Sequence, residues 1–444
     1  MAIDGSHFDV VIVGAGPAGA LTAAMLTAVK PDLKVCVLDH RSETRRHYGL
    51  SIAKDAIQAA TQTLKGYLRP DDKVYNQRIY TLIDKLQSWS GTTQKVSDLE
   101  IELATLAKAS GATILRKEEY RETLTKDVFD RVLGTEEKPG LTDTEKELRG
   151  YFKDARIIVG AEGHHSAVRQ RFMEGGDEEK RADVKIFQHV IELKFKTIPE
   201  TTKRGMKGSV KDSHCEGVAF ETMPNKKEGD PFKPVSTHFF VGKKTYEAFQ
   251  GAEDRTAWNL ETLQEEASKN PSVANQALKI AHYLKGLLDR GGCCVEPQIK
   301  RLPIQMYKSP EVYKAYDGKI ITLVGDALSG AVLARGVNKA FMEASQLVPA
   351  ILENSEKAFK NYEKAVGKIY ENEKWWAEFK AFWIEGGRHA LRYFFKPVKF
   401  ILWPVTALYF YCKSFFVKEP SLGDLLRKNT LRALEIPRAP EKTS

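Results

Sequence analysis

The sequence predicts an α/β protein: a doubly wound parallel sheet, an inserted β-sheet domain and a C-terminal helical tail. Three observations predict this fold. A glycine-rich turn joins a short apolar strand to an apolar helix near the N-terminus, two later segments repeat a strand followed by a Gly- and acid-containing turn, and the stretch between those two alternates in polarity as strands do. At 444 residues, 42% of them hydrophobic, the chain exceeds one ordinary domain and can bury a sizeable core.

The expected domain order places the insertion inside the doubly wound domain. Residues 1–182 and 301–354 form the two parts of that domain, 183–300 form the inserted sheet, and 355–444 form the helical C-terminal region. Alternation at Val190–Phe195 and Thr237–Val241 supports strands in the insertion, where we expect substrate to bind. A separate stretch, 121–150, is highly charged, and we interpret it as a hairpin or loop.

The N-terminal motif has the spacing of a dinucleotide-binding βαβ unit. Residues 8–13 read as a buried strand, a helix is expected to about Val29, and a second strand over 34–38 leads to an acid. The turn between the first strand and the helix carries the cofactor-binding candidates Gly14, Gly16, Pro17, Ala18 and Gly19. Glycines at these places permit a tight turn, a close approach to a pyrophosphate and close helix–strand packing, so we predict a Rossmann-like nucleotide site.

The residues after the second strand indicate which nucleotide binds. Asp39 lies twenty residues past Gly19, where a carboxylate accepts hydrogen bonds from ribose hydroxyls. His40 and Arg41 follow it, and Asp-x-Arg fits the adenosine end of FAD better than that of NADP. A nearby basic residue, Arg46, is a further candidate for phosphate binding.

Two later turns complete the set of candidate cofactor-binding residues. Each follows an expected strand: 156–159 precedes the first turn, and 320–324 precedes the second. The candidates are Glu162, Gly163 and Arg169 in the first turn, Gly325 and Asp326 in the second, and Gly336, Val337 and Asn338 at the start of a helix expected to end near Leu352. Ser166 is expected to cap the helix after the first turn, and no acid close after Arg169 offers it a local ion pair.

These three motifs, in this order, resemble the single-component flavin-dependent aromatic hydroxylases of the p-hydroxybenzoate hydroxylase type. The resemblance implies that the second motif, with Glu162 in place of the usual Asp, contacts both FAD and a transient NADPH. It also implies that Asp326 binds the flavin ribitol and that the helix opening at Gly336 points its N-terminus at the isoalloxazine. A positive helix end would stabilise negative charge on reduced flavin.

Within that class the chain looks most similar to the flavin monooxygenase domain of the MICAL proteins. The similarity rests on Val37–Leu50, on the stretch Asp98–Ile114, which we expect to be helical, and on two strings in the inserted sheet, 217–220 and 237–241. Two departures accompany it: Ser97 stands where the family has an FAD-contacting Arg, and the loop 328–335 is short and lacks proline and aromatic residues.

The resemblance implies an FAD-dependent, NADPH-using monooxygenase acting on a small molecule or a protein side chain, and the C-terminal segment would place it near a membrane. Two alternatives stay open: a flavin reductase or dehydrogenase for a lipid-like substrate, and a non-catalytic module that keeps the fold. The cofactor would carry the chemistry, so we assign no catalytic side chain. His47, His164, His165 and His238 are all possible acids or bases, each more simply explained as a structural or surface histidine.

The net charge of +9 is concentrated near the C-terminus. Residues 381–444 hold 11 Lys and Arg against 5 Asp and Glu, so this tail carries +6. Within it, 391–418 mixes aromatic residues with Lys, and its longest uncharged run, 400–412, is shorter than the ~20 residues of a spanning helix. We expect a monotopic membrane contact there, with a packed helical subdomain or a true span as alternatives.

Composition also excludes several classes of protein. The basic charge does not spread along a binding face, so a nucleic-acid partner is not expected. Five cysteines without a CxxC pair predict neither a disulfide framework nor a zinc site. Together with the absence of a signal-peptide pattern, these features predict a cytoplasmic protein, peripheral to a membrane.

Overall fold

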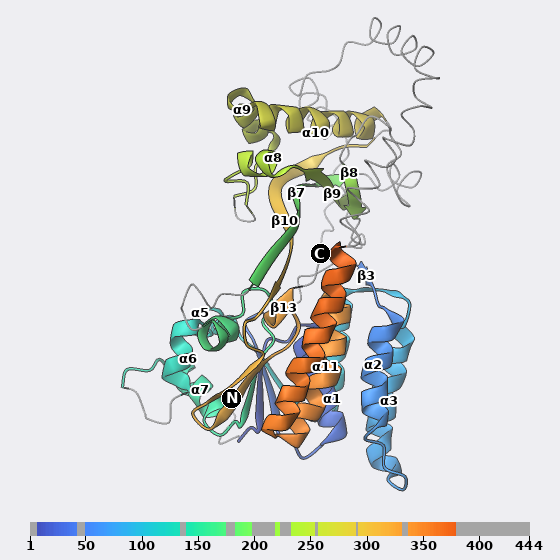
Figure 1. Ribbon diagram of the computed structural model, residues 1–444, viewed down its shortest axis with the longest axis vertical. Coiled ribbons are helices and arrows are strands. Elements are labelled where there is room, and N and C mark those ends of the chain that lie inside the picture. Colours follow the sequence, from blue (N-terminus) through green and yellow to red (C-terminus); the bar gives the residue numbers. More distant parts are fainter. Residues whose placement is uncertain are drawn as a thin grey trace, which may run out of the picture. The chain divides into compact units, whose positions relative to one another are not determined.

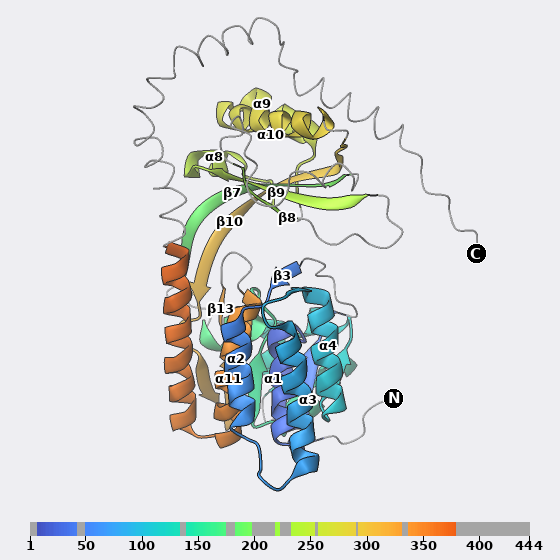
Figure 2. The same cartoon turned by 90° about the vertical axis from the view of Figure 1, so that its right-hand side faces the viewer.

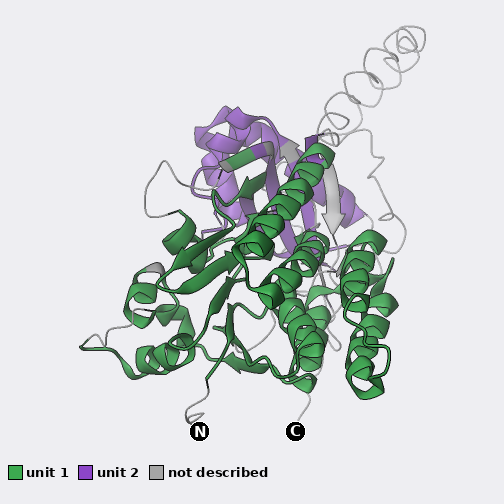
Figure 3. Ribbon diagram, turned by 60° about the horizontal axis from the view of Figure 1, so that its bottom comes forward, with its two compact units in different colours: residues 1–185, 305–376 green, residues 186–304, 377–444 purple. Residues whose placement is uncertain are grey.

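The computed structural model describes residues 7–41, 49–133, 139–174, 183–197, 218–222, 232–253, 256–289, 292–330 and 336–378. The chain divides into two compact units (Figure 3). The first unit is Met1–Lys185 with Gln305–Trp376, and the second is built on Ile186–Ile304. The fold class is the predicted one, α/β with a second sheet inserted into the chain of the first.

A six-stranded sheet forms the centre of the first unit, in the order β11-β12-β6-β1-β2-β5 (Figures 1 and 2). Its strands are β1 Val10–Val13, β2 Val35–Asp39, β5 Thr113–Arg116, β6 Ile157–Gly160, β11 Tyr313–Tyr316 and β12 Lys319–Leu323. All neighbours are parallel except β11, which pairs antiparallel with β12 at one edge. Because β1, β2 and β6 are buried on both faces, they read as continuous apolar runs.

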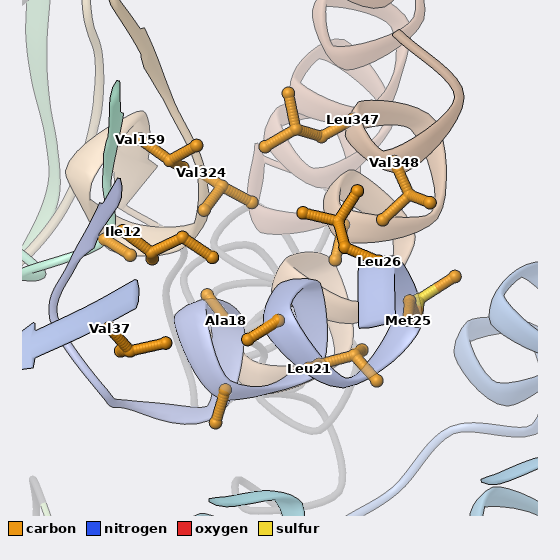
Figure 4. Packing of buried hydrophobic residues seen from close by; sticks show 14 of the residues in the cluster. Ile12, Ala18, Leu21, Met25, Leu26, Val37, Val159, Val324, Leu347 and Val348 are labelled. Atoms are coloured by element: carbon orange, nitrogen blue, oxygen red, sulfur yellow. The ribbon is translucent and has the colours of Figure 1, made fainter. Parts of the chain in front are cut away.

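Helix α1, Pro17–Val29, is buried on every side and contains no charged residue. It lies between the sheet and helix α11, Gly336–Glu353, as Figure 4 shows for Leu21 and Leu26 of α1 beside Leu347 of α11. An apolar helix surrounded by protein gains about 25 cal/mol for each Å² of apolar surface that it buries. This packing fixes the N-terminus of α1 at the end of β1.

Other helices cover the two faces of this sheet. On the α1 side the structure has α2 Lys54–Lys65, α3 Lys73–Trp89 and α4 Val96–Ala109, with the two-stranded ribbon β3 Gly49–Ser51 and β4 Thr93–Lys95. On the other side lie α5 Tyr120–Thr123, α6 Lys126–Val132 and α7 Asp143–Phe152 (Figure 1).

Two sequence-based expectations for this unit were wrong. The charged stretch 121–150 contains helices rather than a hairpin or loop; α7 starts with a capping box in which the Thr142 and Glu145 side chains each bind the other's backbone N–H. The helix expected over Asp98–Ile114 ends at Ala109, because a turn at Gly111 (φ +108°) leads into β5.

Residues 356–378 form a helix that packs on the first unit. Phe359, Tyr362 and Val366 belong to the core of that unit, and the Tyr362 hydroxyl donates to the Leu323 carbonyl at 2.6 Å. Within the described part of the chain, no helix combines the length and apolarity needed to cross a bilayer. The predicted membrane-contacting segment, 391–418, lies outside the described residues.

The second sheet has the order β13-β10-β7-β9-β8. Its strands are β7 Asp183–Thr197, β8 Val218–Thr222, β9 Lys233–Val241, β10 Val295–Lys308 and β13 Ser329–Gly330. The described part of the second unit contains helices α8 Lys243–Ala248, α9 Leu260–Lys269 and α10 Pro271–Asp289. Helices α9 and α10 cover one face of this sheet, and β7 and β9 present alternate side chains to the core beneath them (Figure 2).

Candidate functional site

Four turns that carry predicted site residues meet at the carboxyl edge of the parallel sheet. Val13 at the end of β1 pairs with Leu38 of β2 and with Gly160 of β6, and Gly160 pairs with Leu323 of β12. In open parallel sheets, ligands bind outside the carboxyl ends of the strands where the strand order reverses. Here the order reverses at β1, whose neighbours β2 and β6 lead to opposite edges of the sheet.

Two glycines of the first turn are required by backbone contacts. A Cβ on Gly14, which has φ +107°, would lie 2.5 Å from the Ala161 carbonyl oxygen. A Cβ on Gly19 would lie 2.0 Å from the Gly14 carbonyl oxygen. Real Cβ atoms do not approach so closely, so these positions exclude any side chain and hold the β1 turn against the β6 turn.

Gly16 differs, because the space above it is open to a ligand. It is the N-cap of α1 and has ordinary extended backbone (φ −68°) with no side-chain cap. The described atoms within 4 Å of a Cβ placed there are Arg41 Nη2 and Glu100 Oε1, both at 3.8 Å. A helix N-terminus with free N–H groups and a guanidinium nearby is suited to bind an anion.

Asp39 is buried and all its acceptor sites are engaged by the chain itself. Its Oδ2 accepts from Ala15 N at 2.8 Å and from Arg41 Nη2 at 2.9 Å; its Oδ1 accepts from Arg41 N at 2.9 Å and Nε at 3.2 Å. Burial alone would raise the pKa of this carboxyl, but the Arg41 and Ala15 contacts together hold it below its ordinary value. For Asp39 to accept from ribose hydroxyls, as predicted, the Arg41 guanidinium must give up a bond. His40 lies beside the same carboxylate.

Glu162 organises the turn after β6. Its two oxygens accept from Ser166 Oγ at 2.7 Å and from Val168 N at 3.0 Å, and burial raises the pKa of its carboxyl despite these bonds. Ser166 in turn accepts from the backbone N–H of Arg169, which is the cap expected from the sequence. Gly163 takes φ +89° in this turn.

Arg169 connects two of the turns. It is 5% exposed, and its guanidinium donates to Glu174 Oε1 at 2.9 Å, to the Ala327 carbonyl at 3.1 Å and to the His164 carbonyl. The expectation that no nearby acid pairs with this arginine was wrong, because Glu174 lies within reach one turn further along the chain. The arginine therefore fixes the β6 turn to the turn after β12.

The turn after β12 presents a carboxylate toward the start of α11. Gly325 has φ +68°, and a Cβ there would lie 2.7 Å from Ala18 Cβ, so this turn packs directly on the start of α1. Asp326 Oδ1 lies 3.1 Å from the position of a Cβ on Gly336. Within the described ranges, no side chain or backbone N–H binds the Asp326 carboxylate, which is therefore available to a hydroxyl-bearing ligand.

The start of α11 is where the sequence placed it, at Gly336. Val337 is buried, and the Asn338 amide accepts from Ala53 N at 2.8 Å and donates to the Ser51 carbonyl at 2.9 Å. The structure thus gives Asn338 the task of fixing strand β3 to α11. That it also contacts a cofactor stays a prediction.

A buried ion pair beneath the β12 turn was missed from the sequence. Lys339 and Glu343 are both 0% exposed, with Nζ and Oε1 3.1 Å apart. Glu343 Oε2 accepts from Gly325 N at 2.7 Å, and Lys339 donates to Ser329. Burial raises the pKa of Glu343, and the lysine opposes that rise. A Lys and a Glu four residues apart normally read as an exposed helix pair, so the sequence carries no signal of this role.

Some predicted site residues cannot be placed. Arg46 and His47 lie outside the described residues, as does most of the 328–335 loop. Ser97 is buried at the start of α4, where its hydroxyl donates to Asp98 at 3.2 Å. In the described ranges no group of three or more His, Cys, Asp or Glu side chains could hold a metal ion, and the cysteines described there, Cys36, Cys293 and Cys294, form no disulfide.

The arrangement fits a dinucleotide better than a small anion. It offers an open space over Gly16 with the Arg41 guanidinium and the Glu100 carboxylate beside it, and an acidic residue at the end of β2 for the nucleoside end. Beside the N-terminus of α11 it offers the Asp326 carboxylate, to which no group in the described ranges donates. These positions follow the ends of three different strands, so a ligand that used all of them would have to be extended along the sheet edge.

Comparison with known proteins adds a short family match and distant structural neighbours. The Thi4 family model matches residues 1–44, which include β1, α1 and β2. No curated protein matches the sequence. Similar solved structures include the tetracycline destructase Tet(55), with 13% identity over 85% of this chain and 89% of that one and a TM-score of 0.49.

Two further neighbours have comparable scores. OxyS anhydrotetracycline hydroxylase from Streptomyces rimosus has 15% identity over 99% of this chain and 78% of that one, with a TM-score of 0.46. The myxobacterial chondrochloren halogenase CndH, described as a variant of FAD-dependent halogenases, has 15% identity over 82% of this chain and 80% of that one, also with a TM-score of 0.46. Identities and scores this low transfer neither an activity nor a ligand to this chain.

Proposed function

We propose that this chain binds FAD at the carboxyl edge of its parallel sheet and acts as an NADPH-dependent monooxygenase. The observation that carries the proposal is the meeting of four turns, from four strands, around an open space over Gly16. Contacts that leave no room for a Cβ hold these turns together: Gly14 lies against the Ala161 backbone, and Gly325 lies against the Ala18 side chain.

The residues present can be assigned to parts of FAD. The N-terminus of α1 at Gly16 and the Arg41 guanidinium would hold the pyrophosphate, Asp39 the adenosine ribose, and Asp326 the hydroxyls of the ribitol. The N-terminus of α11 would place a positive dipole end near the flavin ring, where it favours the anionic reduced form. When bound, FAD supplies two-electron redox chemistry between a nicotinamide and oxygen.

Steady-state assays of the purified, FAD-loaded protein test the activity. We expect NADPH to be oxidised in air, faster than NADH, with oxygen consumed and hydrogen peroxide released when no substrate is present. A substrate would convert peroxide release into product without lowering the oxygen uptake. NADPH oxidation with neither oxygen uptake nor peroxide would instead establish the reductase alternative, and flavin binding without any NADPH oxidation would establish the non-catalytic module.

A membrane contact through 391–418 is part of this proposal. It is supported by the mixture of aromatic and basic residues in that segment and by the +6 charge of 381–444. Aromatic rings favour the headgroup boundary, and lysines there meet anionic lipid. The substrate, a small molecule or a protein side chain, stays a prediction to be tested by profiling oxidised proteins and metabolites.

A further inference from the structure

A cavity in the first unit is lined by described residues that have no part in the proposed flavin site. It lies where the helix 356–378 meets α2 and α11, and its volume is about 210 Å³. Trp375 and Trp376 come from the first of these helices, Asp55 from the first turn of α2, and Met342 from α11. Pockets for drug-sized ligands measure roughly 300–1,000 Å³, so this cavity suits a smaller chemical group.

The two tryptophans give the cavity an aromatic corner. Trp375 and Trp376 are 55% and 43% exposed, and their ring centroids lie 5.3 Å apart with 78° between the ring planes. Two rings in this edge-to-face arrangement form nearly perpendicular walls. The faces of indole rings carry negative potential, and their carbon atoms pack well against methyl groups. The corner therefore favours a cation that carries apolar substituents.

The charged groups of the cavity have the sign that such a cation requires. Asp55 and Glu373 both line it, and no Lys, Arg or His is among the described residues of the lining. Glu373 is 5% exposed, so its charge lies at the protein-facing side of the cavity, while the tryptophans border the solvent. Attraction between opposite charges is stronger beside low-dielectric protein than in water, so both carboxylates favour a cation here.

The lysines next to these two acids in the sequence are held away from them. Lys374 Nζ lies 3.5 Å from Glu371 Oε2, one turn back on the same helix. The Lys54 side chain lies beside Gly91, where its Cε would be 3.2 Å from an added Cβ. Neither lysine is part of the lining, so the cation that the cavity favours comes from a ligand.

We propose that this cavity binds the trimethylammonium group of choline. A quaternary ammonium keeps its charge at every pH and has no N–H, so it needs no hydrogen-bond acceptor in the site. Its methyl groups would pack on the two indoles and on the polarizable thioether of Met342. A primary ammonium of the same charge would have to give up water from three N–H groups, and an aromatic corner does not replace those bonds.

Two sources can supply this group, free choline and the headgroup of a choline lipid. The helix 356–378 precedes 391–418 in the sequence, the segment for which we propose a membrane contact. A lipid headgroup is the source that this position favours, and that choice rests on the proposed membrane contact. The binding of choline itself rests only on the cavity.

The first test is calorimetric titration of the full-length protein with choline chloride. We expect a Kd of about 1 mM or below, with binding at least about tenfold weaker for 3,3-dimethylbutan-1-ol, which has the same shape without the charge. W376L should weaken choline binding about tenfold and D55N about threefold, both without loss of thermal stability because these side chains are exposed. Y80L is the matched control, since Tyr80 is 45% exposed on α3 and does not line the cavity.

Three results would overturn the proposal. They are no heat of binding with choline at about ten times the expected Kd, equal binding of the uncharged alcohol, and equal choline binding by wild type, W376L and D55N. A peptide containing trimethyllysine that binds at least about tenfold more tightly than choline would also overturn it, by assigning the cavity to a protein partner.

Vesicle flotation distinguishes the two sources of choline. Vesicles with equal shares of anionic lipid are made with either phosphatidylcholine or phosphatidylethanolamine, whose headgroups differ only in the three methyl groups. We expect the wild type to bind the choline vesicles about threefold better and W376L to show no such preference. Equal flotation beside intact choline binding would support the cavity and assign it to free choline. None of these measurements depends on flavin, so their failure leaves the proposed function standing, and the reverse also holds.

Discussion

At Gly16 a substitution should change ligand binding without changing the stability of the fold. Its backbone is in a region open to any residue, and a Cβ there would meet no described atom closer than 3.8 Å. We therefore expect G16V to fold with the stability of the wild type but to lose at least about 100-fold in FAD affinity, because the methyl groups occupy the anion cradle. Fluorescence titration with FAD, beside a thermal melt, measures both.

A control for this substitution lies on a distant helix. A Cβ placed on Gly150 in α7 would have no described atom within 4 Å, and this glycine has no positive φ. G150A should therefore leave FAD affinity unchanged and raise stability by up to about 1 kcal/mol. If G16V binds FAD as the wild type does, the cradle over Gly16 is not the pyrophosphate site.

Glu192 should make the stability of the second unit depend on pH. Burial would raise the pKa of its carboxyl, but the His238 and Ser236 hydrogen bonds and two nearby lysines lower it to about 2, below the ordinary value of 4.5. A carboxyl whose pKa is lower in the folded than in the unfolded protein stabilises the fold at pH values above the unfolded pKa. This stabilisation is lost as the pH falls from about 4.5 toward 2. The shift corresponds to roughly 3 kcal/mol. Urea unfolding of wild type and E192Q should show the gap between them narrowing over this range; a gap that does not change with pH would contradict the ionised, paired carboxylate.

At the scale of elements, the packing of α11 depends on the buried ion pair between Lys339 and Glu343. Removing the lysine alone, as K339M, leaves Glu343 as a buried charge beside Gly325, and we expect a loss of about 3–5 kcal/mol in the free energy of unfolding. E343Q should cost less, since an amide oxygen can still accept from Gly325 N. The K339M/E343Q double variant should cost less than the sum of both, and strict additivity in denaturant titrations would show that the two groups do not interact.

The elements that the sequence predicted well are those whose signals are local. The turns at Gly14, Gly163 and Gly325, the strands before them and the start of α11 at Gly336 lie within a residue or two of the expected places. Their geometry is set by backbone requirements that only certain residue types meet. Helices over 121–150 were missed because their charged residues obscured short apolar faces, such as Leu148 and Phe152 of α7.

The contacts that define the site were less predictable. Arg169 reaches Ala327, and Lys339 reaches Ser329, through bonds that depend on how distant turns pack. The hydrogen bonds from the Arg41 guanidinium to the Asp39 carboxylate also depend on the conformation of the loop, which the spacing of the two residues alone does not predict. A motif therefore predicts the local turn more reliably than it predicts which side chains of that turn are engaged by the rest of the chain.

At the scale of the whole molecule, the charge is unevenly distributed. Removing 381–444 takes +6 of the net +9 from the chain and leaves the described body, through residue 378, intact. We expect the full chain to float with vesicles that contain anionic lipid and the truncated chain to stay in solution. The full chain should bind more weakly to neutral vesicles, because they offer its lysines no anionic lipid. High salt should also weaken its binding, because salt screens the attraction between the lysines and anionic lipid.

A full-length variant with Lys396, Lys399, Lys413 and Lys418 changed to Gln is the matched control, since it keeps the aromatic residues. It should lose most of the preference for anionic vesicles. Flotation of the truncated chain to the same extent as the full chain would remove the membrane contact from the account while leaving the flavin site untouched.

The central claim is that the carboxyl edge of the parallel sheet holds one FAD. The most direct measurement is the absorption spectrum of protein incubated with FAD, passed through a desalting column and then denatured to release what it bound. We predict a yellow protein that releases about one FAD per chain, against almost none for G16V. A wild-type protein that emerges colourless and releases no FAD would contradict the account.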